Sequence, residues 1–195
     1  MTLPRAPEDQ DTLDMVARVK LGDRSAGDEF YRRYRDELLL TIRAGMGPRL
    51  RAAMDSEDLL QSVALEALEQ LQKFEPRGPG TLRAFLNRVV RSKLVDRARG
   101  LAARKRSGAV PLTDELEAAV SGKSEVRYSD PRYEALEQAL LALPADLREV
   151  IRMRRFDGMP SKDIASRTGR SDASVRKLYS RAMARLSMLL GEGET

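Results

Sequence analysis

The sequence predicts an all-α protein in which a flexible linker joins two small helical domains, the C-terminal one a helix-turn-helix. Apolar residues recur at three- and four-residue spacing over most of the chain, which is the period of one face of an α-helix. Aromatic residues make up only 5% of the 195 residues and Trp is absent, which favours small helical domains over a sheet-rich core. A stretch bearing Gly, Ser and Pro separates the two periodic regions and predicts the linker.

The first domain is predicted over residues 12–106, after a disordered lead-in at residues 1–11 that carries two prolines and alternating charge. Its first helix ends at Leu21-Gly22-Asp23, a sequence that typically ends one helix and begins the next. The apolar residues of that helix are Leu13, Val16, Ala17 and Val19. A second helix ends near Gly45 and carries the residues most expected in the core, namely Phe30, Tyr31, Tyr34, Leu38, Leu39 and Ile42.

The next helix has an apolar residue on its polar side. Asp55 and the acids that follow supply a cap and a negative first turn, which the helix dipole favours. One stripe is apolar and faces the core: Leu60, Val63, Ala64, Ala67, Leu68 and Leu71. The opposite side is polar except for one leucine: Asp58, Gln61 at its edge, Ser62, Leu65 and Glu69. Leu65 is therefore either an ordinary exposed leucine or the apolar anchor of a face that docks a partner helix.

A turn-rich loop, FEPRGPG at residues 74–80, leads into a long basic helix, TLRAFLNRVVRSKLVDRARG. Residues 83–106 contain nine Lys or Arg and a single acid, Asp96, a density that suits a surface following phosphates. The buried side of this helix is expected to be apolar: Leu82, Phe85, Leu86, Val89, Val90 and Leu94. Its far side carries mainly cations, with one residue flanking them: Arg88, Arg91, Val95, Arg99 and, beside them, Asn87.

The linker is predicted at residues 107–130, the second domain at 131–190 and an acidic tail at 191–195. In the second domain, Gly169 separates two short helices, and the second of these opens at Ser171. Its stripe is apolar: Val175, Leu178, Tyr179, Ala182 and Leu186. The other face holds small residues and charges: Asp172, Ala173, Arg176, Lys177 and Arg181. This pattern is typical of a helix-turn-helix whose second helix enters the major groove, although a helical hairpin with a solvated basic face has the same spacing.

Residues 143–190 resemble the fourth conserved region of bacterial sigma factors. The matching positions are Leu143-Pro144, Arg148-Glu149-Val150-Ile151, Phe156-Asp157-Gly158, Ile164-Ala165, Gly169-Arg170-Ser171, Val175 and Arg181-Ala182. DSEDLLQSVALEAL resembles the sigma segment that binds RNA polymerase. The resemblance is to the small, two-domain, extracytoplasmic-function (ECF) type. It implies a non-catalytic subunit that binds core RNA polymerase and directs promoter recognition and transcription initiation.

The resemblance also assigns contacts to residues. Those for the clamp helices of the large polymerase subunit are Asp55, Asp58, Leu59, Gln61 and Leu65. Those for the minus-ten element are Asn87, Arg88, Arg91 and Arg99. Those for the minus-thirty-five element are Ser171, Asp172, Ser174, Arg176, Lys177 and Arg181. By the same resemblance, the linker threads the polymerase cleft, and an anti-sigma factor is a further candidate partner.

The basic helix departs from the family pattern in its aromatic residues. The equivalent sigma segment often presents aromatic side chains that stack on unpaired bases. Here Phe85 is expected to be buried, and Asn87 stands where an aromatic residue is frequent. In the resembled family, the loop equivalent to residues 74–80 helps capture a flipped base of the minus-ten element. The resemblance therefore favours base capture by this loop, together with phosphate contacts, over melting by stacking.

Composition excludes several kinds of chemistry. The chain has no Cys and no His, so a Cys/His zinc site, a Cys nucleophile and a His base are impossible, and neither a metal nor a cofactor is expected. Net charge of +5 permits a polyanionic partner. The polar N-terminus lacks a signal-peptide core and no apolar run reaches about 18 residues, so we expect a cytoplasmic protein without a membrane span.

Two other classes of function compete with a sigma subunit. A stand-alone helix-turn-helix regulator would explain residues 143–190 but not the residue pattern of 55–71 or the basic helix. A metal-dependent nuclease could use Asp55, Glu57 and Asp58. These three acids lie within one capped turn, which explains them without chemistry, so we expect no enzymatic activity.

Overall fold

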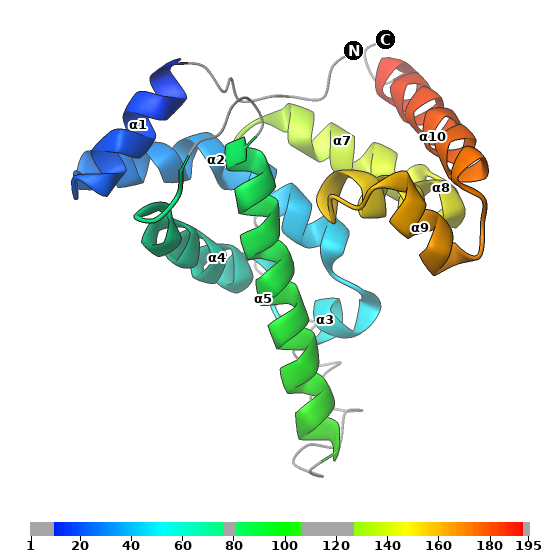
Figure 1. Cartoon of the computed structure of the whole chain (residues 1–195), viewed down its shortest axis with the longest axis horizontal. Helices are drawn as coiled ribbons and strands as arrows, with labels where there is room; N and C mark the ends of the chain where they lie inside the picture. Colours follow the sequence, from blue (N-terminus) through cyan, green and yellow to red (C-terminus); the bar gives the residue numbers. More distant parts are fainter. Residues whose placement is uncertain (1–9, 76–80, 107–126, 193–195) are drawn as a thin grey trace. The chain divides into compact units, whose positions relative to one another are not determined.

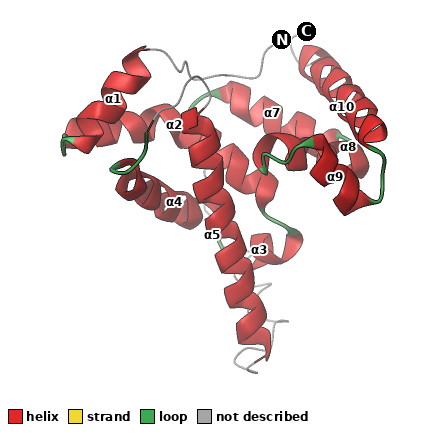
Figure 2. Cartoon of the chain, in the orientation of Figure 1, coloured by secondary structure: helices red, strands yellow, loops and turns green. Residues whose placement is uncertain are grey.

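The computed structural model describes residues 10–75, 81–106 and 127–192. Within these residues all regular structure is helical and there is no strand (Figure 2). The chain divides into two compact units, with the boundary between Arg127 and Tyr128. The predicted all-α class with a C-terminal helix-turn-helix is confirmed.

The described residues of the N-terminal unit form five helices (Figure 1): α1 (Gln10–Lys20), α2 (Arg24–Gly45), α3 (Pro48–Ala53), α4 (Ser56–Leu71) and α5 (Thr81–Arg106). Helix α2 contacts α1, α4 and α5, and α4 also contacts α5. Phe30 and Tyr34 are fully buried on α2, with ring centroids 5.2 Å apart, as the sequence predicts. Burial of this apolar surface is the main force that holds the helices together.

Helix α1 packs through only some of its apolar residues, since Leu13 is 43% exposed and Ala17 is exposed. The buried positions are Thr12, Met15, Val16 and Val19. They follow the helical i, i+3, i+4, i+7 pattern, but a polar threonine occupies the first position and hides the register. The helix also includes Gln10 and Asp11, which were predicted to belong to the disordered lead-in.

The ends of α2, α3 and α4 follow ordinary capping chemistry. The Asp55 carboxylate accepts a hydrogen bond of 2.8 Å from the Glu57 amide and caps α4, as predicted. Helix α3 begins with Pro48 in its first turn, a position where the missing N–H costs nothing. The sequence pattern did not predict α3, because six residues are too short to display a helical period.

The described residues of the C-terminal unit form α7 (Pro131–Ala142), α8 (Ala145–Ile151), a π-helical turn η1 (Arg152–Phe156), α9 (Ser161–Thr168) and α10 (Asp172–Glu192). Helix α10 contacts α7, α8 and α9. The core is apolar and drawn from all of these elements: Tyr133, Leu136, Leu140, Leu143, Leu147, Val150, Ile151, Met153, Ile164, Val175, Ala182 and Leu186. Helix α10 therefore serves both as the centre of this core and as the second helix of the helix-turn-helix.

The boundaries of the C-terminal unit differ slightly from the predicted ones. Residues 107–126 of the predicted linker lie outside the described residues. Tyr128 is only 8% exposed and stacks on Tyr133 at 6.0 Å between ring centroids, so it belongs to the folded unit and not to the linker. Asp130 caps α7 by accepting from the Arg132 amide at 2.9 Å. At the other end, α10 continues to Glu192, into the predicted tail.

One guanidinium stabilises the turn between α8 and α9. Arg152 pairs with Glu149 at 2.6 Å and with Asp157 at 2.7 Å, so it bridges the two ends of the π-helical turn. The hydrogen bond from Arg152 lowers the pKa of Glu149 below its usual value. A π-turn is rare and gives no periodic signal in the sequence, so the sequence did not predict it.

Candidate polymerase and DNA interfaces

The polar side of α4 carries an exposed apolar residue, as predicted. The side chain of Leu65 is 65% exposed, and Asp58, Gln61 and Glu69 are exposed on the same side of the helix. We call Asp58, Gln61 and Leu65 the α4 face. An apolar residue among polar ones suits a partner that supplies a small apolar pocket and hydrogen-bonding groups around it.

Two residues that were assigned to the polymerase contact, Leu59 and Asp55, have structural roles within the N-terminal unit instead. Leu59 is 1% exposed and packs in the core, at the edge of the buried arc of α4. Its assignment as a contact residue is therefore corrected to a core residue. Asp55 is half-buried and its carboxylate caps the helix. Both residues therefore help to fold α4, which carries the α4 face.

Two of the cations on α5 hold the N-terminal unit together. Arg83 pairs with Glu37 of α2 at 2.8 Å, with both side chains about four-fifths buried. Lys93 pairs with Glu66 of α4 at 2.5 Å. These two ion pairs fix α5 against α2 and α4. The two cations therefore have a structural role, which reduces the number that can contact a nucleic acid.

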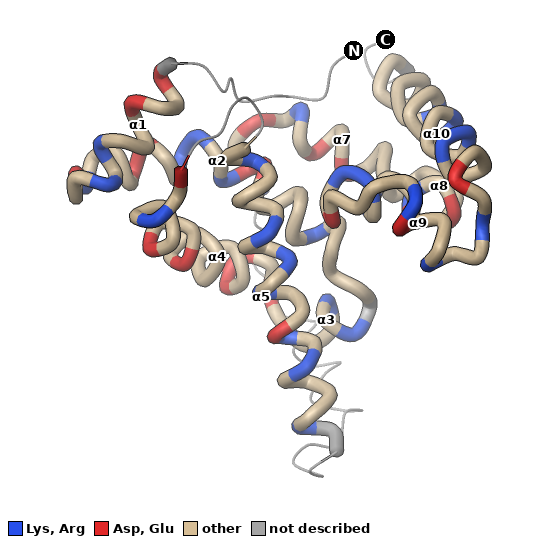
Figure 3. The backbone as a smooth tube through the Cα atoms, in the orientation of Figure 1, with Lys and Arg blue, Asp and Glu red and all other residues tan. Residues whose placement is uncertain are grey.

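Several other cations of α5 lie on its outer side. Arg88, Arg91 and Arg99 are exposed, while Asn87 is half-buried. From Val95 to Arg104 every side chain except Leu101 is exposed, so this part of the helix makes little contact with its own unit. Figure 3 shows Lys and Arg at intervals along the length of α5, with one acidic position in its lower half. A basic helix of this kind can follow a phosphate backbone.

The structure supports the expectation that Phe85 is unavailable for stacking on bases. Phe85 is 8% exposed, and its ring centroid lies 5.0 Å from that of Phe74. Phe74 therefore anchors the start of the loop onto α5. Residues 76–80 of the loop, to which base capture was assigned, lie outside the described residues.

The helix-turn-helix has the predicted turn and cap. Gly169 ends α9 in the left-handed conformation, with φ of +67°, which glycine adopts without the strain that a side chain causes. The Ser171 hydroxyl accepts a 3.1 Å hydrogen bond from the Ser174 amide and caps α10. Val175, Ala182 and Leu186 are buried, while Leu178 and Tyr179 are half-buried. The apolar stripe of α10 thus packs against the rest of the unit, and the opposite side of the helix faces solvent.

That outward side brings the predicted minus-thirty-five residues together. Arg176, Lys177 and Arg181 are exposed on α10, and Ser171 and Ser174 are exposed at its start. Asp172 is the least exposed member, with 33% of its side chain accessible, and its carboxylate pairs with Arg176 at 3.1 Å. Apart from Arg181, which lies further along α10, these side chains combine hydroxyl groups and guanidinium or ammonium groups at the start of the helix. This is the part of a recognition helix that reaches base edges.

Sequence reasoning missed a second set of cations in the C-terminal unit. These residues are exposed and precede α10: Arg154, Arg155, Lys162 and Arg167. Arg170, one of the positions that match the family, is exposed beside them. Arg154 donates to the Met159 carbonyl at 3.2 Å. The signal was present in the sequence, since the first helix of a helix-turn-helix crosses the DNA backbone and benefits from cations.

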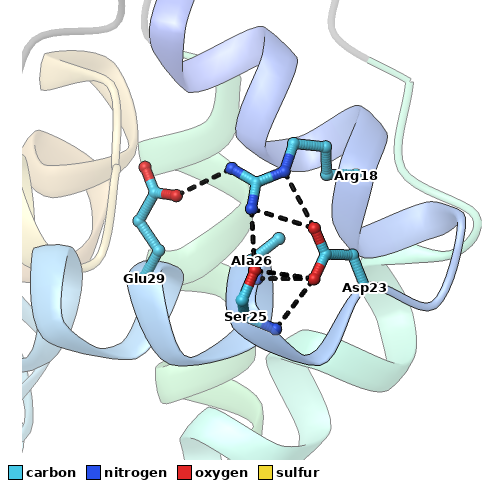
Figure 4. Close-up of polar contacts among 5 residues, drawn as sticks. All are labelled: Arg18, Asp23, Ser25, Ala26 and Glu29. Carbon is cyan, nitrogen blue, oxygen red and sulfur yellow. Dashed lines mark hydrogen bonds and ion pairs between the residues drawn. The ribbon is translucent and has the colours of Figure 1, made fainter.

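A separate polar cluster joins α1 to α2 (Figure 4). Arg18 pairs with Asp23 at 2.9 Å and with Glu29 at 3.0 Å. Asp23 also caps α2, accepting from the Ser25 amide at 2.8 Å and the Ser25 hydroxyl at 2.7 Å. The Ser25 hydrogen bond, followed by that from Arg18, lowers the pKa of Asp23 to about 2. All of these groups are satisfied by one another, so the cluster is structural.

The low pKa of Asp23 predicts how acid weakens the link between α1 and α2. Its folded pKa of about 2 lies below the ordinary 3.8, so the ionised side chain stabilises the fold above pH 3.8 and loses that effect as pH falls towards 2. Asp23→Asn keeps a capping oxygen but removes the charge. We expect the variant to melt below wild type near neutral pH and to match it near pH 2, as followed by circular dichroism. A gap in melting temperature that stays constant over this range would contradict the assignment.

The described residues set two further limits. None of their helices is both long enough and apolar enough to span a membrane. Nor do residues 10–75, 81–106 and 127–192 contain a group of three or more acidic side chains placed to hold a metal ion. The acids at the start of α4 are accounted for by the cap and the first turn of that helix.

Two helical units, the second with an outward-facing helix-turn-helix, define a class of helical transcription factors that bind DNA. The family model described as Sigma-70 region 2 matches residues 30–104, and that described as Sigma-70, region 4 matches residues 133–186. The chain belongs to the sigma-70 family of RNA polymerase sigma factors and is of the ECF type. It is thus a sigma factor that binds core RNA polymerase and directs promoter recognition and transcription initiation. Members of this family are non-catalytic initiation factors.

Several known proteins are similar over most of the chain. ECF RNA polymerase sigma factor SigD of Mycobacterium tuberculosis is 28% identical over 172 residues, which are 88% of this chain and 80% of that protein. ECF RNA polymerase sigma factor SigM of the same species is 28% identical over 178 residues, or 91% of this chain and 84% of that protein. The solved structure of CnrH in complex with the cytosolic domain of CnrY covers 91% of this chain and 96% of that chain, at 25% identity and a TM-score of 0.42.

Proposed function

We propose that this sigma factor divides its contacts between three exposed surfaces, each on a different helix. The α4 face docks on the clamp helices of the large subunit of core RNA polymerase. On α5, Arg88, Arg91 and Arg99 follow the minus-ten strand, with Asn87 at the edge of that surface. On α10, Ser174, Arg176, Lys177 and Arg181 contact the minus-thirty-five duplex, with Ser171 and Asp172 at the start of the helix. The protein would act in the cytoplasm, and an anti-sigma factor is included among its candidate partners.

The observation that carries the docking surface is the exposure of Leu65. Its side chain is 65% exposed although the helix has a complete buried stripe of its own, so α4 does not need this leucine for folding. Apolar residues that are exposed amid polar neighbours commonly serve as anchors for a partner, and polar residues beside them set the register. Gln61 lies one turn and Asp58 two turns before Leu65, so both can fill that role.

A capture experiment with core RNA polymerase tests the docking surface. Wild type is expected to capture the polymerase stoichiometrically, and the Asp58→Ala/Leu65→Ala double variant is expected to lose at least about 10-fold in affinity, since anchor residues contribute about 2 kcal/mol or more. The matched control is Leu21→Ala, because Leu21 is 87% exposed in the same unit but lies between α1 and α2. We expect the control to bind like wild type.

Each alternative result has a definite meaning. Equal capture by wild type and the double variant would mean that the protein binds polymerase through a surface other than the α4 face. Loss in the Leu21 control as well would attribute the effect to general loss of apolar surface. No capture by wild type, under conditions in which another sigma factor binds, would favour a stand-alone helix-turn-helix regulator.

A further inference from the structure

The start of α10 contains an ion pair between two of the proposed DNA-contacting residues. The Asp172 Oδ2 atom lies 3.1 Å from a terminal guanidinium nitrogen of Arg176, one helical turn further along. The side chain of Arg176 is 68% exposed, whereas that of Asp172 is 33% exposed. We propose that Asp172 is a positioning residue, which holds the Arg176 guanidinium in the orientation that reads a base pair. This inference rests on the proposed contact between α10 and the minus-thirty-five duplex.

Asp172 is the fixed member of the pair. It follows the cap residue Ser171, whose hydroxyl accepts from the Ser174 amide, so its backbone is held in the first turn. The positive end of the helix dipole favours a carboxylate at this position. Arg176 by contrast has a long flexible side chain with most of its surface in solvent. The carboxylate therefore restricts the guanidinium, and not the reverse.

Restricting Arg176 has a consequence for base reading. A guanidinium has five N–H donors, so a single contact to Asp172 leaves others free on its outer edge. Two such donors can bind the O6 and N7 acceptors of a guanine in the major groove, and this bidentate contact requires a defined plane. A side chain already held in few rotamers loses less freedom on binding. Asp172 thus favours the orientation in which the Arg176 guanidinium binds a base through two hydrogen bonds, over orientations in which it contacts a nearby phosphate.

The ion pair itself adds little to the stability that the helix dipole already gives Asp172. Exposed i, i+4 ion pairs contribute little to folding, and here the Arg176 side chain is mostly in solvent. A carboxylate at a surface that approaches DNA also repels phosphates and so weakens overall affinity. An acid at this place therefore opposes non-specific binding, and in our proposal its benefit lies in selectivity.

The test uses holoenzyme assembled from the full chain and core RNA polymerase. A DNA library randomised over the upstream promoter duplex first gives the base preference of wild type at each position. The same selection is then made with Asp172→Asn, Asp172→Glu, Arg176→Ala and the Asp172→Asn/Arg176→Ala double variant. The matched control is Asp163→Asn, since Asp163 lies in the first turn of α9, the other helix of the motif.

We expect Asp172→Asn to reduce the preference at one base pair by about 5- to 10-fold, the lower part of the range for a bidentate contact, with unchanged or higher total DNA affinity. Asp172→Glu should restore part of the preference, and the Asp163 control should behave like wild type. Asp172→Asn should have no added effect in the Arg176→Ala background, because Asp172 acts through Arg176.

Three results would overturn the inference in distinguishable ways. An unchanged preference in Asp172→Asn would leave the ion pair without a role in reading. An equal loss of preference in the presence and absence of Arg176 would make Asp172 a direct base contact, for example to the amino group of cytosine. If Arg176→Ala itself changes no base preference, the proposed contact of Arg176 fails together with the inference.

Discussion

Leu60→Ala is expected to lower the free energy of unfolding of the N-terminal unit by about 2–5 kcal/mol, while Leu65→Ala is expected to change it by no more than about 0.5 kcal/mol. The same substitution is made twice on α4, five residues apart. Leu60 is fully buried on α4, so its truncation removes apolar contacts and leaves a cavity. Leu65 is 65% exposed, so its truncation leaves no cavity.

Hydrogen exchange of the α4 and α2 amides in the full chain measures this difference, because it reports the stability of one unit at a time. Only Leu60→Ala should speed exchange in these helices, and the C-terminal helices serve as an internal reference. A comparable loss of protection in both variants would mean that Leu65 is packed in solution, for example against a second copy of the chain. The α4 face would then be unavailable to polymerase. If Leu65→Ala leaves stability unchanged but abolishes polymerase capture, Leu65 is needed for docking and not for folding, whereas Leu60 on the same helix is needed for folding.

The elements that the sequence predicted well are those in which several local signals agree. Helix α4 has a capping aspartate, acidic residues in its first turn and an unbroken apolar stripe. Helix α10 has a capping serine after a left-handed glycine and again one stripe. Where cap and period agree, the buried side is fixed, and the outward side follows from geometry. This is why most of the candidate contact residues are indeed exposed.

The failures arise where the determining interaction is not local. Leu59 was assigned to the docking surface, but it lies at the edge of the buried arc, and only the packing of other helices against α4 decides that it is covered. The register of α1 depends on Thr12, a polar residue that is 2% exposed in the core. Neither of these features produces a periodic pattern.

Arg176→Ala is expected to cost about 1–3 kcal/mol of preference at the base pair that Arg176 contacts, while Lys177→Ala is expected to weaken binding to all sequences alike. The two residues are neighbours on α10 and both are exposed. The physical difference lies in the side chains: a guanidinium is a planar fork that matches two acceptors on one guanine edge, and an ammonium is a point charge suited to a phosphate. Adjacent positions therefore serve as controls for each other.

Binding of holoenzyme to the selected promoter and to its single-base variants, measured over a series of salt concentrations, separates the two effects. Lys177→Ala should lower the slope of log affinity against log salt by about one, because one counterion fewer is released, and should keep the ranking of promoters. Arg176→Ala should reduce the differences in affinity among promoters that vary at one base pair. Its effect on the salt dependence should be smaller than that of Lys177→Ala, because Asp172, 3.1 Å away, already offsets part of the Arg176 charge. A uniform loss in both variants would mean that α10 contacts only phosphates. Selectivity would then have to come from another surface, and the exposed cations of α5, together with those before α10, would be the next to test.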